Sequence, residues 1–457
     1  MIVEEQDIQR PWEELEKLVD ELDLEQIEAF LNALPADESA RAITRLSDDA
    51  VDRLLTVLSP EDAAEVVEYI PDVHAVDVIE RLEPETAGAI VQELPSDVQA
   101  DLLGNLEPED AEAILNTMHP DDAEEIRALT LYDDDVAGGL MITEFLTYPQ
   151  TITIAGVLED LAINAETYRD YHVPYIYVCD SHDRLVGVLR LHDLVLAPRH
   201  RAIENVMIRE PITLNDLATL DEVREVFDRV AFFGLPVVDA EGILVGVVQR
   251  SGLEAALANR SENDFRTSQG IVGGEELRTM PFFQRARRRL AWLSVNIVLN
   301  IIAASVIAWY QDTLASVIAL AVFLPIISDM SGCSGNQAVA VSIRELALGL
   351  VRPRELFRVW GKELAVGGLN GLALGLLIAL TAWLWKGNPF LGGVVGAAMM
   401  LNTIVSVSIG GMVPLVLKRF NFDPALASGP ILTTITDMCG FFFVLRLATM
   451  LVSRLAN

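Results

Sequence analysis

The chain has 457 residues, a length that allows two or three domains, and its formal net charge is −35. Residues 1–280 hold 61 acidic and 19 basic residues, a net of −42, whereas residues 281–457 hold 7 acidic and 14 basic residues and are strongly apolar. So acidic a half excludes nucleic acid as a partner, because phosphates would be repelled, and it favours cation binding or simple solubility.

Residues 1–131 contain an apolar repeat with a period of twelve. Its positions are Leu34, Leu46, Leu58, Ile70, Leu82, Leu94, Leu106 and Met118. In several units a proline stands two positions later, followed by acidic residues, which is typical of a helix N-terminus. Each unit is predicted to be a helix of about two turns that buries its apolar face only by stacking on its neighbours. We predict an acidic, superhelical α-helical repeat domain.

Residues 132–260 contain two copies of one strand–turn–strand–helix pattern, at 173–197 and 233–257. This pattern resembles a tandem pair of α/β CBS domains, with boundaries at 132–200 and 201–260. CBS pairs often bind adenine nucleotides through a Gly-x-x-Ser/Thr-x-x-Asp turn. The first copy has Arg190 in place of the hydroxyl residue before Asp193, and the second has Gly252 in place of the aspartate. The resemblance therefore implies that adenine nucleotide is not an expected ligand here.

Residues 261–286 begin polar and acidic and end in a basic run. We predict a connecting helix over this segment, which would transmit the state of the acidic half to the rest of the chain.

Five apolar stretches follow within residues 287–457, each long enough to cross a hydrocarbon core of about 30 Å. They cover residues 288–310, 313–349, 364–385, 390–417 and 427–452. Basic residues gather before the first stretch, between the second and third, and between the fourth and fifth. The positive-inside rule then places the N-terminal half in the cytoplasm and the C-terminus outside. We predict an all-α, multi-pass domain of five helices in the cell (inner) membrane.

Two of these stretches carry polar groups that a lipid-facing helix would not tolerate. The second contains Pro325, Asp329, Gly332 and Gly335, the glycines within a polar run over residues 331–337, which predicts an interrupted helix packed in protein or lining a wet cavity. The fifth contains Asp437, and Arg446 lies nine residues further on, about 13 Å along a helix. A charge at the bilayer centre costs roughly 2.5–3.5 kcal/mol, so we interpret Asp437 as functional. Oxygen ligands of this kind suit Mg²⁺ or Ca²⁺.

Over nearly its whole length the chain resembles the MgtE family of magnesium channels and transporters. The marks of the resemblance are the junction 132–145, Pro325 with Gly335-Asn336-Gln337 in the second stretch, and residues 423–437 in the fifth. The resemblance implies a homodimer in the lipid bilayer that takes up Mg²⁺ through a pore lined mainly by the second and fifth membrane helices. It implies that the pore residues are Pro325, Gly335, Asn336, Gly429, Thr434 and Asp437, with Asp437 as the selectivity carboxylate.

The resemblance also implies regulation by Mg²⁺. When cytosolic Mg²⁺ is high it would bind between acidic surfaces of the soluble domains, and the connecting helix would then plug the pore. We expect the regulatory ligands to include Asp221, Asp228, Asp264, Glu275 and Glu276. Cys333 and Gly429 each stand where many family members have asparagine, so ion preference and hydration contacts could differ.

Other functions remain open at this point. A proton- or Na⁺-coupled carrier of Mn²⁺, Co²⁺ or Mg²⁺ would also use Asp437, by changing its protonation. An intramembrane aspartyl protease needs two acids, which Asp329 and Asp437 supply, but neither lies in a Gly-x-Gly-Asp sequence. The sequence therefore predicts a transporter and not an enzyme.

Overall fold

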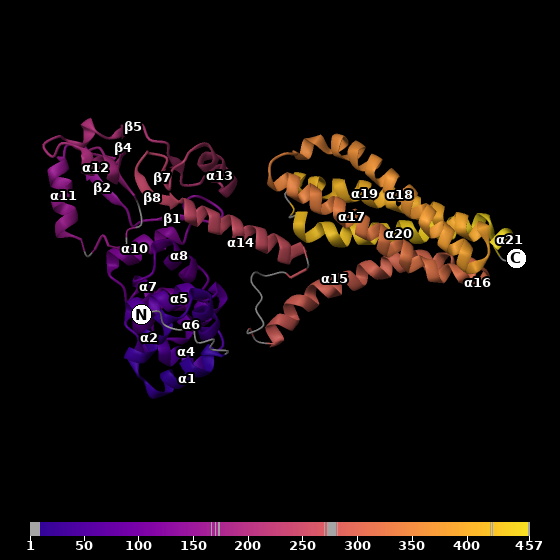
Figure 1. The fold of residues 1–457 in the computed structure, drawn as a ribbon, viewed down its shortest axis with the longest axis horizontal. Helices are drawn as coiled ribbons and strands as arrows, with labels where there is room; N and C mark the ends of the chain where they lie inside the picture. Colours follow the sequence, from indigo (N-terminus) through magenta and orange to yellow (C-terminus); the bar gives the residue numbers. More distant parts are fainter. Residues whose placement is uncertain are drawn as a thin grey trace. The chain divides into compact units, whose positions relative to one another are not determined.

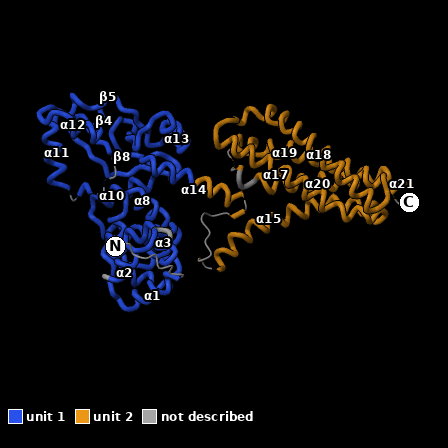
Figure 2. Tube along the Cα trace, in the orientation of Figure 1, with its two compact units in different colours: residues 1–259 blue, residues 260–457 orange. Residues whose placement is uncertain are grey.

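The structure is a computed structural model that describes residues 10–455, apart from residues 166, 170, 172–173, 269, 272–279, 281, 421 and 423. It forms two compact units, residues 1–259 and residues 260–457 (Figure 2). The first unit contains short helices and two small β-sheets, and the second contains long apolar helices (Figure 1). The predicted fold class is confirmed: a helical repeat, an α/β part with two similar sheets, and an all-α part with five candidate membrane spans.

The helical repeat of the first unit consists of α1 (Pro11–Glu21), α2 (Leu24–Ala33), α3 (Ala36–Ile43), α4 (Asp48–Val57), α5 (Pro60–Tyr69), α6 (Asp72–Arg81), α7 (Pro84–Gln92), α8 (Ser96–Gly104), α9 (Pro108–Leu115) and α10 (Pro120–Leu129). Helices α1, α3, α5, α7 and α9 pack in one row, and α4, α6, α8 and α10 pack in a second. The repeated apolar residues lie at the helix ends, and from Leu46 to Met118 all except Leu82 are buried. The period of twelve therefore corresponds to one helix and its turn.

The α/β part contains two four-stranded sheets with the same plan. Its strands are β1 (Met141–Ile142), β2 (Leu146–Pro149), β3 (Tyr175–Cys179), β4 (Leu185–Arg190), β5 (Ile208–Arg209), β6 (Leu214–Asn215), β7 (Gly234–Val238) and β8 (Leu244–Gln249). Its helical segments are α11 (Ile154–Ile163), α12 (Leu191–Leu196), η1 (Ile203–Asn205) and α13 (Leu220–Arg229). The strand orders are β2-β3-β4-β5 and β1-β8-β7-β6.

Strand β1 lies in the predicted first domain but belongs to the second sheet. It pairs antiparallel with β8, with Met141 opposite Val248. Just before it, the backbone of Ala137 donates to Ala218 over 2.7 Å. The helical repeat packs on the same strand, because the Ser96 hydroxyl of α8 accepts from the Thr143 backbone and donates to Glu144. The helical repeat and the second sheet therefore share one continuous apolar core.

The long helix α14 (Arg250–Ser268) follows β8 directly. The remaining helical segments are α15 (Phe282–Trp309), α16 (Gln311–Ser316), η2 (Ile318–Val322), α17 (Phe323–Ala347), η3 (Pro353–Glu355), α18 (Leu356–Lys386), α19 (Pro389–Arg419), α20 (Pro424–Met450) and α21 (Val452–Leu455). Most residues between α14 and α15 lie outside the described part of the chain, so the connecting helix predicted over 261–286 stays a prediction.

The second membrane span differs from the prediction. It is one continuous α-helix over Phe323–Ala347, and the irregular part precedes it in the 3₁₀ segment η2. Pro325 lies in the first turn of α17, where a missing backbone N–H breaks no intrahelical bond. The expected interruption at Gly332 and Gly335 is therefore wrong.

Helix α19 is the central element of the second unit, which contains the five candidate membrane spans and is called the membrane unit below. It packs against α17, α18 and α20, and it is the most buried of the five spans. Glycines spaced four apart allow α18 and α19 to approach closely, as small residues commonly do in membranes. A Cβ at Gly375 of α18 would lie 2.7 Å from the Gly396 carbonyl oxygen of α19, and a Cβ at Gly371 would lie 2.8 Å from the Met400 carbonyl oxygen.

This packing predicts that Gly375→Ala destabilises the membrane unit. The added methyl group meets backbone atoms that cannot rotate away, so we expect a loss of about 1–3 kcal/mol and a lower unfolding temperature in detergent. Gly368→Ala on the same helix is the matched control, because no atom lies within 4 Å of its Cβ position. Equal unfolding temperatures for the two variants would contradict the close approach of α18 and α19.

Candidate functional site

Asp437 lies on α20 with its side chain half-buried. Its carboxylate accepts a hydrogen bond from the Ser328 hydroxyl of α17. Among the described residues no arginine or lysine forms an ion pair with it. A carboxylate in an apolar bundle is therefore held by a neutral hydroxyl, which leaves its negative charge available to a cation.

Two of the three predicted pore residues of α17, Pro325 and Asn336, lie on one exposed face together with Asp329. Pro325, Asp329 and Asn336 are exposed in the single chain, and spacings of four and seven residues place them on the same side of a helix. Gly335 instead faces inward, and a Cβ there would clash with Ser406 of α19. Asp329 and Asn336 thus lie on a stripe that the described part of the chain does not cover, whereas Ser331, Ser334 and Ser342 of the same helix are buried.

Two predicted pore residues of α20 lie one and two turns before Asp437. The Thr434 hydroxyl donates a hydrogen bond of 2.7 Å to the Pro430 carbonyl oxygen, so its hydrogen is used within its own helix. Gly429 has no atom within 4 Å of its Cβ position, so the space beside it is open. Asp437 forms a hydrogen bond with Ser328, and among the described residues it forms none with Asn336.

Several polar residues of the membrane unit were missed by the sequence interpretation. Ser328 was passed over in favour of its neighbour Asp329, although it is the residue that contacts Asp437. Helix α19 also buries a polar group of side chains: Asn402, Thr403, Ser406 and Ser408. The available signal was their clustering within seven residues of an otherwise apolar span.

Carboxylates of the first unit crowd together around α8. Burial raises the pKa of Asp97 to about 6, and Glu144 contributes to the shift. Desolvation by neighbouring groups, with Asp134 the largest charged contributor, also raises the pKa of Asp101 to about 7, although Asp101 is exposed on the surface and solvent weakens this effect. These acids come from α8 and from the segment before and after β1. They therefore repel each other where the helical repeat meets the α/β part.

The predicted regulatory acids do not form a ready-made metal site. Asp221 and Asp228 both lie exposed on α13, two turns apart, and Asp221 lies 3.7 Å from Arg224. Asp264 lies on α14, whereas Glu275 and Glu276 are outside the described residues. Across the described part of the chain, no group of three or more His, Cys, Asp or Glu side chains is placed to hold a metal ion.

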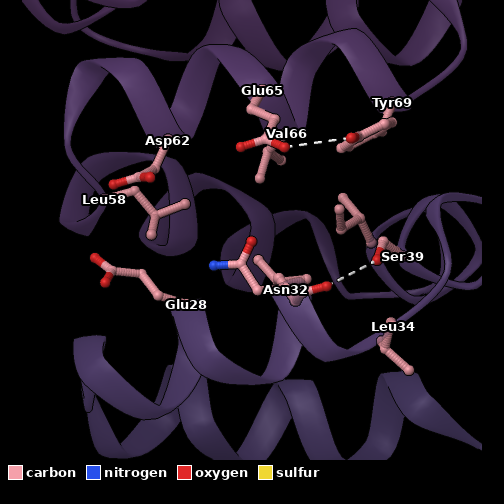
Figure 3. A pocket seen from close by; sticks show the side chains of 11 residues that line it. Glu28, Asn32, Leu34, Ser39, Leu58, Asp62, Glu65, Val66 and Tyr69 are labelled. Carbon is pink, nitrogen blue, oxygen red and sulfur yellow. Dashed lines mark hydrogen bonds between the residues drawn. The ribbon is translucent and has the colours of Figure 1, made fainter.

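A cavity of about 150 Å³ opens within the helical repeat (Figure 3). Glu28, Asp62 and Glu65 line it. Glu65 accepts a hydrogen bond from Tyr69 over 3.2 Å and raises the pKa of that tyrosine. Asp62 accepts from the hydroxyl of Ser59, which caps α5. Asp62 and Glu65 are therefore engaged by neighbours on their own helix.

The turn of the first α/β copy is occupied by an ion pair. The Nε of Arg190 lies 2.6 Å from Asp193, and this hydrogen bond holds the pKa of Asp193 below its usual range. Asp193 is the residue that a CBS nucleotide site would use for ribose. Arg190 therefore engages this carboxylate in the structure, and the expectation that adenine nucleotide is not a ligand stays a prediction.

Comparison with known families matches three segments of the chain. Residues 324–447 match the MgtE divalent cation transporter domain, residues 40–135 match the MgtE intracellular N domain, and residues 203–259 match a CBS domain.

Comparison with characterised proteins finds relatives over three quarters of the chain. The chain is 32% identical over 343 residues to a protein of Thermus thermophilus named magnesium transporter MgtE, covering 73% of this chain and 74% of the relative. It is 29% identical over 342 residues to the protein of that name from Bacillus subtilis, covering 75% of each.

Solved structures resemble the first unit. The soluble part of a magnesium transporter aligns with a TM-score of 0.50 and 22% identity, covering 55% of this chain and 99% of that one. The cytosolic domain of the Mg²⁺ channel MgtE in complex with ATP aligns with a TM-score of 0.49 and 28% identity, covering 53% and 99%.

The crowding of acids around α8 predicts that Asp97→Asn stabilises the protein at pH 8 in the absence of divalent ions. A carboxyl whose folded pKa is raised from 3.8 to about 6 costs no stability below pH 4 and its full penalty above pH 7. The gain over the natural protein should therefore approach roughly 3 kcal/mol at pH 8 and become small near pH 4. Thermal unfolding of the first unit across this range measures it.

Asp121→Asn is the matched control, since Asp121 also lies in the first turn of a helix but is 90% exposed. We expect no pH-dependent gain from it. The same gain in both variants would mean that general charge reduction, and not the cluster around α8, is responsible.

Proposed function

The chain belongs to the MgtE family of magnesium transporters, and we propose that it is a Mg²⁺-selective channel that admits Mg²⁺ into the cytoplasm. The observation that carries this proposal is Asp437, a half-buried carboxylate within a membrane span whose only partner in the described residues is the Ser328 hydroxyl. Such an acid is costly to place in a bilayer and is compensated when a cation lies beside it.

A single carboxylate suits a conducting site. Mg²⁺ gives up its water reluctantly, so one carboxylate attracts the hydrated ion without stripping it. Many fixed charges would hold the ion too tightly for it to leave. We propose that two copies of Asp437, one from each subunit of a homodimer, face a shared axis and double the field there.

The exposed stripe of α17 supports the homodimeric pore. Asp329 and Asn336 would be unfavourable against lipid, so this face requires water or a second protein surface. A pore lined by α17 and α20 at a two-fold axis provides both. The side chains of Pro325 and Thr434 and the backbone at Gly429 would then shape its wall.

Regulation follows from the acidic first unit. With the carboxylates around α8 repelling each other, Mg²⁺ binding would replace repulsion by attraction and shift the soluble domains toward a compact, closed state. We propose Asp97 and Asp101 as contributors to this response. Asp221, Asp228 and Asp264 would contribute nearer the membrane, together with Glu275 and Glu276. We place this unit in the cytoplasm and the C-terminus outside the cell membrane.

The second candidate function is a proton- or Na⁺-coupled divalent cation carrier. The same carboxylate would serve it, because Asp437 could cycle between charged and neutral forms. The protease alternative is not retained, because the relatives are named transporters and Asp437 contacts Ser328 instead of a second acid.

Mg²⁺ flux into proteoliposomes tests the role of Asp437. We expect Asp437→Asn to reduce Mg²⁺ flux at least tenfold, because the neutral amide no longer attracts the cation. Asp312→Asn, an exposed acid of α16, is the control and should retain flux. Flux of the natural protein that requires a pH gradient would favour the carrier over the channel.

Deletion of residues 1–260 tests the regulatory proposal. The full chain should lose Mg²⁺ flux as Mg²⁺ on the cytoplasmic side rises into the millimolar range, whereas the truncated chain should remain active. Slower proteolysis of residues 1–280 in millimolar Mg²⁺ would accompany this closure. Equal inhibition of both chains would show that the acidic unit is not the sensor.

A further inference from the structure

Asn402 is a buried amide whose hydrogen-bonding groups are unused. It lies on α19 with a fully buried side chain, and neither its Nδ2 nor its Oδ1 has a partner among the described residues. An unpaired buried polar group costs about 1–3 kcal/mol, so a side chain of this kind normally has a partner such as an ordered water.

Gly440 provides the space that this amide occupies. A Cβ at Gly440 would lie only 2.7 Å from Asn402 Nδ2 and 3.6 Å from a side-chain carbon of Ile327. The amide of α19 therefore lies directly against the backbone of α20, at the level where α17 meets both helices.

The same level contains the pore carboxylate. Asp437 and Gly440 are three residues apart on α20, so their Cβ positions are neighbours about 5–6 Å apart on the helix surface. Ile327 and Ser328 are consecutive on α17, and Ser328 donates to Asp437. Asn402 is thus within reach of Asp437 through one intervening water, which spans about 5.5 Å between two polar groups.

The surroundings of Asn402 are polar enough to hold a water. On α19 the next residue, Thr403, lies with its hydroxyl 3.5 Å from that of Ser331 on α17. The hydroxyl of Ser406 donates to the Ser331 carbonyl oxygen over 2.6 Å. A wholly apolar void would stay dry, whereas a site between the Asn402 amide and the Asp437 carboxylate can hydrate.

We infer that Asn402 is a positioning residue that holds a buried water against Asp437. The water accepts from or donates to the amide and donates to the carboxylate oxygen that Ser328 does not use. Ser328 from α17 and Asn402 from α19 then orient the carboxylate from two sides, which fixes the direction in which it meets a hydrated cation. This inference rests on the proposed function of Asp437.

The ratio of Mg²⁺ to Ca²⁺ flux in proteoliposomes tests the inference on the full chain. Asn402→Leu removes the amide and keeps its branched shape, and we expect the ratio to fall about tenfold, as for the loss of one hydrogen bond to a charged group. Asn402→Ser keeps a hydroxyl that can hold the water and should retain the ratio within about threefold. Ser408→Ala is the matched control, because it removes another buried, unpaired polar atom of the same helix.

The thermal stability of Asn402→Leu gives a second readout. If the amide has no water, replacing it with an apolar side chain should raise the unfolding temperature and leave the flux ratio unchanged, and this result would overturn the inference. If Asn402→Leu does not fold, Gly440→Ala serves instead, because its methyl group displaces the amide. An unchanged ratio in that variant would equally overturn the inference.

These outcomes separate the two proposals. Absence of Mg²⁺ flux in the natural protein would refute the proposed function, and the inference with it. Normal Mg²⁺ flux with an unaltered ratio in Asn402→Leu would refute the inference alone.

Discussion

The hydrogen bond between Ser328 and Asp437 connects the two helices on which transport would depend. It joins α17 and α20 inside an apolar bundle, and it leaves the carboxylate with a charge that no described cation neutralises. The energetic cost of that charge constrains its surroundings, because the neighbouring helices must supply polar groups without supplying a competing lysine or arginine. The polar side chains that α19 buries, Asn402, Thr403, Ser406 and Ser408, are all neutral.

Helix α19 packs in two different ways, tightly against α18 and through polar side chains against α17. Its glycine contacts with α18 form a tight pair in which backbone meets backbone. Its polar residues lie instead toward α17 and α20. The α18–α19 pair therefore supports α17 and α20. Asp329 on α17 is exposed, and Asp437 on α20 is half-buried.

Local periodicity allowed much of this architecture to be predicted. The twelve-residue repeat, the two similar α/β copies and five apolar spans each have a signal within a short window, and Asp437 stands out because its residue type conflicts with its surroundings. Pro325 was misread because a proline in the first turn and a proline in a helix break look alike without knowledge of where the helix begins. Ser328 and Asn402 were missed because a serine or asparagine in a membrane span is common, and their importance depends on residues 109 and 38 positions away.

Because β1 belongs to the second sheet, the helical repeat and the α/β part of the first unit are physically connected through it. Strand β1 is held by α8 of the helical repeat on one side and by β8 on the other, and β8 leads without a loop into α14. A displacement of the helical repeat would therefore be transmitted through the β1–β8 pairing, which involves Met141 and Ile142 of β1, to helix α14. The two α/β copies are also inseparable, since excising the first would strip an edge strand from the second.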